Sequence, residues 1–254
     1  MSRIRRTAAD EPHLVVRTLA SEAADGQAID RHTHGWGQLI YCAEGVMTVE
    51  TAHGAWVAPP HWAVWAPPGV WRQIRFTGRC ALRTLYLRGD LAEGLGDRCA
   101  VMGVTPLLRE LILRATELGM LDARKPVEAA VAQLIRAELE RREVAELELP
   151  APTSPAARRA AELMSSQQGP FNIADVARVV GLSARAMERR FLAETGLPIA
   201  RWRRQARLHD ALRQLAAGAS VKAASVAAGY AAPSAFVAAF REVFGVTPGR
   251  YFSG

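Results

Sequence analysis

Ile173-Ala-Asp-Val-Ala-Arg-Val-Val-Gly181 and Val221-Lys-Ala-Ala-Ser-Val-Ala-Ala-Gly229 are two copies of one short pattern, 48 residues apart. Two later positions recur with a spacing of 49 residues, so that Phe191 and Gly196 become Phe240 and Gly245. A pattern that repeats over about 80 residues, from Phe171 to Phe252, indicates one structural unit used twice. The rest of the chain is interpreted around this repeat.

Each copy has the form of a helix, a tight turn and a second helix. In the first copy the apolar residues recur at i, i+3, i+4 and i+7, which predicts one buried stripe of a helix: Ile173, Val176, Ala177 and Val180. Gly181 can end this helix and Ser183 can cap the next one. The next helix would bury Met187 and Phe191, one turn apart. The sequence therefore predicts two helix-turn-helix units.

The segment between the two copies predicts a long helix. From Leu197 to Ala216 the chain has no glycine and no proline after Pro198, and it is rich in Ala, Arg, Leu and Gln. Twenty helical residues span about 30 Å. Because one turn of B-DNA is about 34 Å, the two units could enter successive major grooves on one face of a duplex.

These features resemble the DNA-binding domain of the AraC/XylS family of bacterial transcription regulators. The resemblance covers roughly the last hundred residues, and the matching residues are Ile173-Ala-Asp-Val-Ala, Gly181-Leu-Ser183, Arg185-x-Met-x-Arg-Arg-Phe191, Gly229-Tyr230, Phe236-x-x-x-Phe240 and Gly245-Val-Thr-Pro-x-x-Tyr251. It implies a sequence-specific regulator whose partners are double-stranded DNA and RNA polymerase. It implies no catalytic residues, so we expect no enzyme.

The second helix of the first unit offers polar groups to DNA. Met187 and Phe191 mark its buried side, so Arg185, Glu188 and Arg189 face away from the core. Arginine can donate two hydrogen bonds to guanine, and glutamate can accept one from cytosine. Ser183 and Arg190 are expected to contact phosphates, which position a protein without reading sequence.

The corresponding helix of the second unit offers fewer polar groups to DNA. Phe236 and Phe240 form its buried pair, and the residues that face outward are Pro233, Ser234, Val237, Ala238 and Arg241. Few of these can form hydrogen bonds with bases. We therefore expect Pro233, Ser234 and Arg241 to contact thymine methyl groups and the DNA backbone, and the first unit to make most of the base discrimination.

The N-terminal half has the pattern of a small β domain, which makes the expected fold class α+β. Short strand-like segments are separated by Gly, Pro and Asp at even intervals: Leu14–Leu19, Gln38–Cys42, Val46–Glu50, Gly54–Val57, Ala63–Ala66, Trp71–Phe76 and Ala81–Leu87. Many short strands with such turns are typical of a sandwich or barrel.

One signature in this half resembles the first cupin motif: Gly26-x5-His32-x-His34-x3-Gln38-x6-Gly45, with glutamine in place of the usual glutamate. In the second motif, after Pro67-Pro-Gly69, Arg72 stands where a third histidine is expected. Arginine cannot bind a metal, and its charge repels divalent cations. We therefore expect a cupin-like barrel without a catalytic metal or other cofactor. His32 and His34 remain candidates for a weakly held metal, for effector contact or for a structural role.

The barrel region is rich in tryptophan. Five of the six tryptophans, at positions 36, 56, 62, 65 and 71, fall within 36 residues. Such residues either fill a small β core or line a pocket for a flat, partly apolar ligand. The candidate effector-binding residues are His32, His34, Trp36, Gln38, Trp65, Trp71 and Arg72.

Two amphipathic helices follow the barrel. One stripe contains Leu107, Leu108, Leu111 and Ile112, and the other contains Val127, Ala130, Val131, Leu134, Ile135 and Leu139. These faces pack either on the barrel or against a second copy, and the family resemblance favours a homodimer. Because Pro150, Pro152 and Pro155 favour extended chain, we expect a linker there. The expected domains are the barrel (1–95), a helical dimerisation segment (96–147), the linker (148–156) and the DNA-binding domain (157–254).

Composition agrees with this division. The net charge of +7 is concentrated after Thr153, where 14 basic residues face 6 acidic ones, as expected for a duplex binder. Three widely spaced cysteines predict small buried thiols in a reducing cytoplasm. The N-terminus has no signal peptide pattern, and the two uncharged runs contain Pro or Gly, so we expect no membrane association.

Two rival interpretations remain. The first is a metal-dependent cupin enzyme fused to a DNA-binding domain, and the second is a DNA-binding protein that responds to no effector.

Overall fold

The computed structural model describes residues 13–51, 54–141, 144–145, 148–166 and 172–252. Its contacts divide the chain into two compact units. The first contains the residues up to Met47 and Ala58–Glu146, and the second contains Thr48–Val57 and Leu147–Gly254. Phe171, the first residue of the repeat region, lies outside the described residues.

The N-terminal half consists mainly of strands. They are β1 (Leu14–Ala23), β2 (Ala28–His32), β3 (Gly37–Cys42), β4 (Val46–Glu50), β5 (Gly54–Ala58), β6 (Trp62–Ala66), β7 (Arg72–Thr77), β8 (Cys80–Leu87), β9 (Ala100–Gly103), β10 (Met120–Asp122), β11 (Val144–Ala145) and β12 (Glu148–Pro150). Seven form a sheet with the order β10-β1-β8-β3-β6-β9-β11, and five form a sheet with the order β12-β5-β4-β7-β2. The predicted strands are confirmed, but they form two separate sheets and not one closed barrel.

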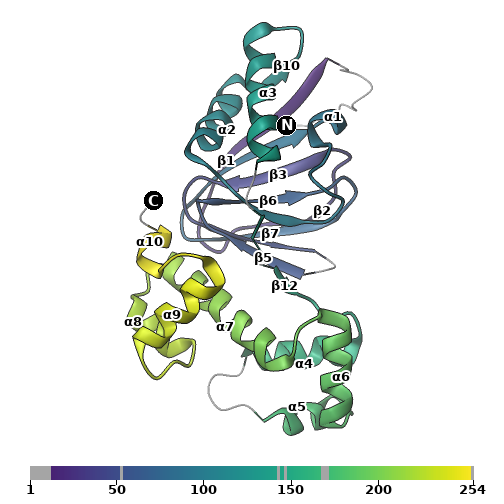
Figure 1. Cartoon of the computed structure of the whole chain (residues 1–254), viewed down its shortest axis with the longest axis vertical. Helices are drawn as coiled ribbons and strands as arrows, with labels where there is room; N and C mark the ends of the chain where they lie inside the picture. Colours follow the sequence, from purple (N-terminus) through teal and green to yellow (C-terminus); the bar gives the residue numbers. More distant parts are fainter. Residues whose placement is uncertain (1–12, 52–53, 142–143, 146–147, 167–171, 253–254) are drawn as a thin grey trace. The chain divides into compact units, whose positions relative to one another are not determined.

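The seven-stranded sheet is covered on one face by helices, as Figure 1 shows. These helices are α1 (Gly89–Ala92), α2 (Pro106–Leu118) and α3 (Pro126–Glu140). Thr105 caps α2, since its side chain accepts a hydrogen bond from the backbone N–H of Leu108, and Pro106 starts the helix. Side chains on alternate positions of β3 and β8, including Leu39, Tyr41 and Leu85, form a core with these helices.

The opposite face of this sheet carries the alternate residues. Gln38, Ile40 and Cys42 of β3 pair in register with Tyr86, Thr84 and Leu82 of β8, so these six side chains share that face. All of β3 is buried, because both faces of the strand are covered. Cys42 and Cys80, 38 positions apart in sequence, are both fully buried as predicted, but the prediction is wrong for Cys99, which is only half-buried.

The C-terminal part consists of helices. They are α4 (Pro155–Ser166), α5 (Ile173–Val179), α6 (Ala184–Thr195), α7 (Ile199–Ala216), α8 (Val221–Ala227), α9 (Pro233–Phe244) and α10 (Pro248–Phe252). Pairs α5–α6 and α8–α9 are the two predicted helix-turn-helix units, and α7 is the predicted long helix between them (Figure 1). The predicted α+β fold class is confirmed.

Hydrogen bonds fix the start of the C-terminal helices. The Glu194 carboxylate accepts hydrogen bonds from the backbone N–H groups of Thr153 and Ser154, at 2.8 and 2.9 Å, just before α4. The Trp202 indole N–H donates to the Pro150 carbonyl at 2.7 Å. The sequence favoured extended chain here, and Glu148–Pro150 is indeed extended, as strand β12 paired with β5. Within the described residues, none of the helices has the length and apolar character needed to cross a bilayer.

Candidate nucleic-acid interface and effector site

The first helix-turn-helix is built as the sequence predicted. Gly181 adopts a φ of 72°, a left-handed conformation that glycine reaches without strain. The Ser183 hydroxyl accepts a hydrogen bond from the backbone N–H of Ala186 at 3.2 Å and caps α6. Met187 and Phe191 are fully buried, and Phe191 packs edge-on against Trp202 of α7 with ring centroids 5.3 Å apart. These contacts fix which face of α6 points outward.

That outward face is polar. Ser183, Arg185, Glu188, Arg189 and Arg190 are all exposed. Three of them, Arg185, Glu188 and Arg189, also line a cavity of about 730 Å³ between α6 and α7. One helix face therefore presents hydrogen-bond donors and acceptors on side chains of several lengths, as direct reading of bases in a major groove requires.

The arginines of α7 differ in their exposure and in their contacts. Four arginines, Arg201, Arg203, Arg204 and Arg207, follow one another along this helix, and of these only Arg201 is exposed. Arg203 is 9% exposed, and burial together with the neighbouring Arg207 charge lowers the pKa of its guanidinium. Arg204 forms an ion pair with Glu242 of α9 at 2.5 Å. The Arg204–Glu242 pair therefore joins α7 to α9 of the second helix-turn-helix.

The second helix-turn-helix is held by aromatic packing. Phe240 contacts Phe236, Phe244 and Tyr251, with ring centroids 4.4 to 5.7 Å apart. Ser220 caps α8, whereas α9 starts at Pro233 without a side-chain cap. The aromatic cluster lies on one side of α9 and leaves the other side for contact with a partner.

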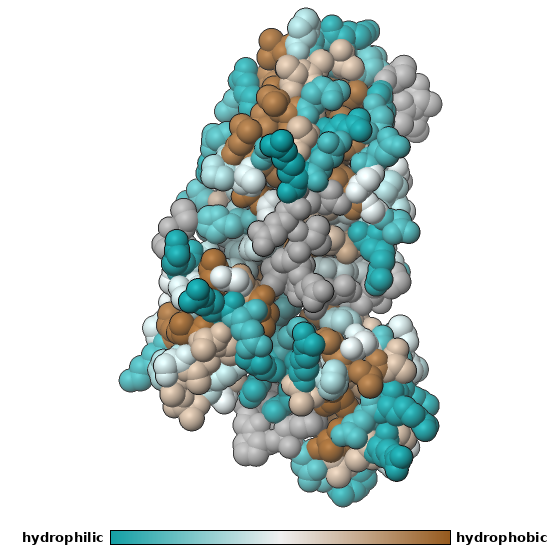
Figure 2. Space-filling model, viewed as in Figure 1, coloured by the Kyte–Doolittle hydropathy of each residue, from teal (hydrophilic) through white to brown (hydrophobic). Residues whose placement is uncertain are grey.

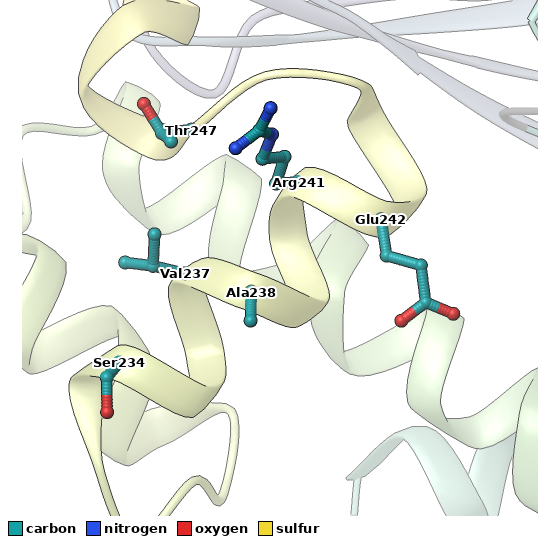
Figure 3. A pocket seen from close by; sticks show the side chains of 6 residues that line it. All are labelled: Ser234, Val237, Ala238, Arg241, Glu242 and Thr247. Carbon is teal, nitrogen blue, oxygen red and sulfur yellow. The ribbon is translucent and has the colours of Figure 1, made fainter.

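This outer side of α9 is mainly apolar, as expected from its sequence. A shallow cavity of about 660 Å³ is lined by Ser234, Val237, Ala238, Arg241, Glu242 and Thr247 (Figure 3). In Figure 3 the Arg241 guanidinium lies near Thr247, and Ser234 lies at the other end of α9. Pro233, Ser234 and Arg241 are exposed. The two reading helices therefore present surfaces of different chemistry.

Five of the seven predicted effector residues lie around one end of β2, β3 and β7. The rings of His32 and His34 have centroids 4.9 Å apart, and His34 packs edge-on against Tyr86 at 4.8 Å. His32 lies opposite Arg72 in the pairing of β2 with β7, and Gln38 lies opposite Tyr86 in the pairing of β3 with β8. Trp71, beside Arg72, is half-buried, and the guanidinium of Arg31 lies over its ring at 4.0 Å.

The other two, both tryptophans, lie elsewhere. Trp65 is opposite Leu39 in the β3–β6 register, so its side chain joins the helix-covered face of the sheet and not the face of Gln38. Its indole packs onto Gly37, where an added Cβ would lie 2.1 Å from the ring. Trp36 is half-buried and has the guanidinium of Arg17 4.7 Å above its ring.

Tyr86 was not singled out from the sequence, although it faces both His34 and Gln38. It is one residue in an ordinary alternating strand, and only the cross-strand register brings it to this place. No group of three or more His, Cys, Asp or Glu side chains that could hold a metal ion occurs among the described residues.

Comparison with known proteins gives the family. Residues 15–151 match the model of the AraC-like ligand binding domain, and residues 176–254 match that of a helix-turn-helix domain. The HTH-type transcriptional regulator NimR of Escherichia coli K12 is 31% identical over 225 residues, which cover 87% of this chain and 81% of NimR.

Two further relatives match more locally. RipA of Corynebacterium glutamicum, also an HTH-type transcriptional regulator, is 33% identical over 110 residues, which are 42% of this chain and 33% of RipA. A solved AraC-type regulator from Chromobacterium violaceum is 27% identical, with a TM-score of 0.37 over 39% of this chain and 90% of that one. The chain belongs to the AraC family of DNA-binding transcription regulators and carries an N-terminal ligand-binding domain.

Proposed function

We propose that α6 and α9 enter successive major grooves of an operator and that α6 makes most of the base discrimination. The single observation that carries this proposal is the contrast between their outer faces, which are charged on α6 and mainly apolar on α9. The 18 residues of α7 span about 27 Å, a length comparable to the rise of about 34 Å of one DNA turn.

Within α6, Arg185 and Arg189 donate to guanine and Glu188 accepts from cytosine. Ser183 and Arg190 contact phosphates. In α9, Pro233 and Ser234 contact thymine methyl groups and sugar, and Arg241 contacts a phosphate. This assignment follows from side-chain chemistry and from the exposure of all eight residues.

Footprinting and competition binding with Arg189→Ala and Ser234→Ala test this proposal. Arg189→Ala should cost about 1–3 kcal/mol of discrimination at bases under α6, since one bidentate contact is worth that much. Ser234→Ala should change discrimination little. Equal losses in the two half-sites would contradict the proposal.

The effector enters the N-terminal domain at the end of β2, β3 and β7. His32, His34, Gln38, Trp71 and Arg72 surround it. Trp36 and Trp65 lie outside this group, and Trp65 packs onto Gly37. A ligand changes operator binding only if it binds two conformations of the regulator with different affinity.

The regulator acts by binding and not by catalysis. The rival, a metal-dependent cupin enzyme, needs ligands that converge on a metal, and Arg72 occupies the position of the third histidine. Metal analysis of the purified protein, with a turnover screen, separates the two. A stoichiometric bound metal with turnover would favour the enzyme.

The active form is a homodimer in the cytoplasm that also contacts RNA polymerase. Apolar side chains on the outside of α3 support the dimer. The reducing compartment is supported by the cysteines, since Cys42, Cys80 and Cys99 form no disulfide among the described residues. The functional division is the cupin-like β domain (1–95), the dimerisation segment (96–147), the linker (148–156) and the DNA-binding domain (157–254), and strands β9, β10 and β11 of the second segment complete the seven-stranded sheet of the first.

A further inference from the structure

Arg72 is the most deeply buried charge near the proposed effector site. It is 0% exposed at the start of β7, where burial alternates so that Arg72, Ile74 and Phe76 face the interior. Its Nη1 donates a hydrogen bond to the Val70 carbonyl at 2.7 Å. Its Nε and Nη2 are also buried, and neither has a hydrogen-bond partner among the described residues.

The surroundings of Arg72 do not neutralise it. Among the residues that the structure describes, Arg72 forms no ion pair, and the groups close enough to act on it electrostatically are Cys99 and Tyr86. Neither of them is a carboxylate, the usual partner of a buried guanidinium. Burial accordingly lowers the pKa of Arg72. A buried charge without a counter-ion costs free energy, which a bound anion would recover.

The two vacant donors have a particular geometry. Nε–H and Nη2–H lie along one edge of the planar guanidinium and point in nearly parallel directions. Two oxygens of a carboxylate match this edge and accept both hydrogen bonds side-on. One uncompensated positive charge is balanced by one negative charge, which favours a monoanion over a dianion such as phosphate.

Tyr86, one of the two groups close enough to act on Arg72, adjoins His34 and Gln38, and these side chains suit the rest of a small organic acid. Tyr86 and His34 present aromatic rings in edge-on contact, and Gln38 is 2% exposed with an Oε1 that has no hydrogen-bond partner among the described residues. An acid with an apolar or aromatic body and one hydroxyl or amide donor would satisfy all of these groups.

We propose that the effector of this regulator is a small organic monoacid whose carboxylate binds side-on to Nε and Nη2 of Arg72. This inference rests on the proposed function, because it names the ligand class of the same effector site. The ligand stabilises the conformation in which Arg72 is buried, which supplies the difference in affinity between two states that regulation requires.

The first experiment needs no ligand. The thermal midpoints of the full chain, Arg72→Met and Arg75→Met are compared in a dialysed, anion-poor buffer. Arg75 lies on the same strand but is exposed, so it is a matched control. Removing the uncompensated charge should raise the midpoint of Arg72→Met by about 2 °C or more, and Arg75→Met should change it by about 1 °C or less. A lower midpoint for Arg72→Met would overturn the inference.

The second experiment titrates matched probes: benzoate against benzamide, hexanoate against hexanamide, and inorganic phosphate. The wild type and Arg75→Met should bind at least one acid about tenfold or more tightly than its amide, and Arg72→Met should lose this preference. Equal binding of acid and amide, no binding of either acid, or a preference that survives in Arg72→Met would overturn the inference. Phosphate binding as tight as that of the acids would overturn the assignment to a carboxylate.

Operator binding of the same samples separates this inference from the proposed function. Arg72→Met should still bind the duplex, but its duplex affinity should no longer respond to an added acid, whereas that of the wild type and of Arg75→Met should respond. If the wild type binds its duplex normally but shows no preference for an acid over its amide, the inference fails and the proposed function stands. If Arg189→Ala leaves discrimination unchanged, the proposed reading of DNA fails whatever the acids do.

Discussion

Two glycines that end equivalent helices differ in what surrounds them. Gly181 and Gly229 have φ values of 72° and 73°, so both occupy the left-handed region. A Cβ on Gly181 would meet no atom within 4 Å, whereas a Cβ on Gly229 would lie 2.8 Å from Nη1 of Arg207. The same guanidinium lies 5.7 Å from the ring of Tyr230. Gly229 therefore allows both a turn and the close approach of an arginine.

This difference predicts unequal costs for the same substitution. Gly181→Ala should destabilise by about 1 kcal/mol, the strain of a left-handed alanine. Gly229→Ala should cost more, about 2 kcal/mol, because Arg207 must also move from Tyr230. Denaturant unfolding of the two variants measures this difference, and equal costs would contradict the role of Arg207.

His209 predicts a pH dependence. It is 3% exposed on α7 near Phe244, and burial, with a smaller contribution from the Arg213 charge, lowers its pKa from 6.5 to about 4. Below pH 6.5 the unfolded chain therefore binds a proton that the folded chain does not. Stability is complete above pH 6.5 and falls towards pH 4, by about 3 kcal/mol in all.

His209→Gln should remove this fall, because glutamine does not titrate in the range. Unfolding free energies at pH 7, 5.5 and 4.5 measure it, with His61→Gln, at an exposed position, as the control. A pH dependence unchanged in His209→Gln would contradict the assignment.

At the scale of elements, α3 is apolar on two faces. The single stripe expected from sequence divides in the structure, where Ala132, Ile135 and Leu139 pack into the core. Val127 and Leu134 remain 64% and 47% exposed on the outside. Figure 2 shows apolar residues on the surface where α2 and α3 lie. Leu107 of α2 is also 50% exposed, so the apolar surface includes both helices.

If this surface forms the dimer, a charge within it should separate the subunits. Leu134→Glu should convert a dimer into a monomer, because a buried carboxylate without a partner is costly. Gln133→Glu adds the same charge at the adjacent exposed position and should leave the dimer intact. Sedimentation velocity measures both. A wild type that is monomeric at all concentrations would exclude the dimer.

At the scale of the whole molecule, the excess of positive charge after Thr153 predicts salt-dependent DNA binding. Arg190→Ala should lower the slope of log K against log salt by about 0.9, the value for one phosphate contact. It should weaken specific and nonspecific binding alike, whereas Arg189→Ala should weaken mainly specific binding. Arg159→Ala, which removes an exposed arginine paired with Glu162, is the control. A slope unchanged in Arg190→Ala would contradict the phosphate contact.

The DNA-binding half could be predicted almost completely from the sequence. Its signals are local: the spacing of Val176 and Ala177 on one helix, the glycine at 181 and the capping serine at 183 all act within a few residues. The exposure of Arg185, Glu188 and Arg189 followed directly from the buried positions of Met187 and Phe191. The sequence did not predict the burial of Arg203, because that burial depends on how α7 packs against the two helix-turn-helix units.

In the N-terminal half the sequence by itself determined seven strands, β1 and β3 to β8, the two histidines and the arginine in place of a third histidine, but it did not predict β2 or β9 to β12. Only the tertiary structure decided which side chains meet. Strand alternation assigns residues to the two faces of a sheet but does not say which face is covered by helices. Only the structure shows that α2 and α3 cover the face of Trp65 and not the face of Gln38. Likewise, Tyr86 reaches Gln38 through a register set by hydrogen bonds between strands distant in sequence, and Arg72 becomes a buried charge only when the sheets enclose it.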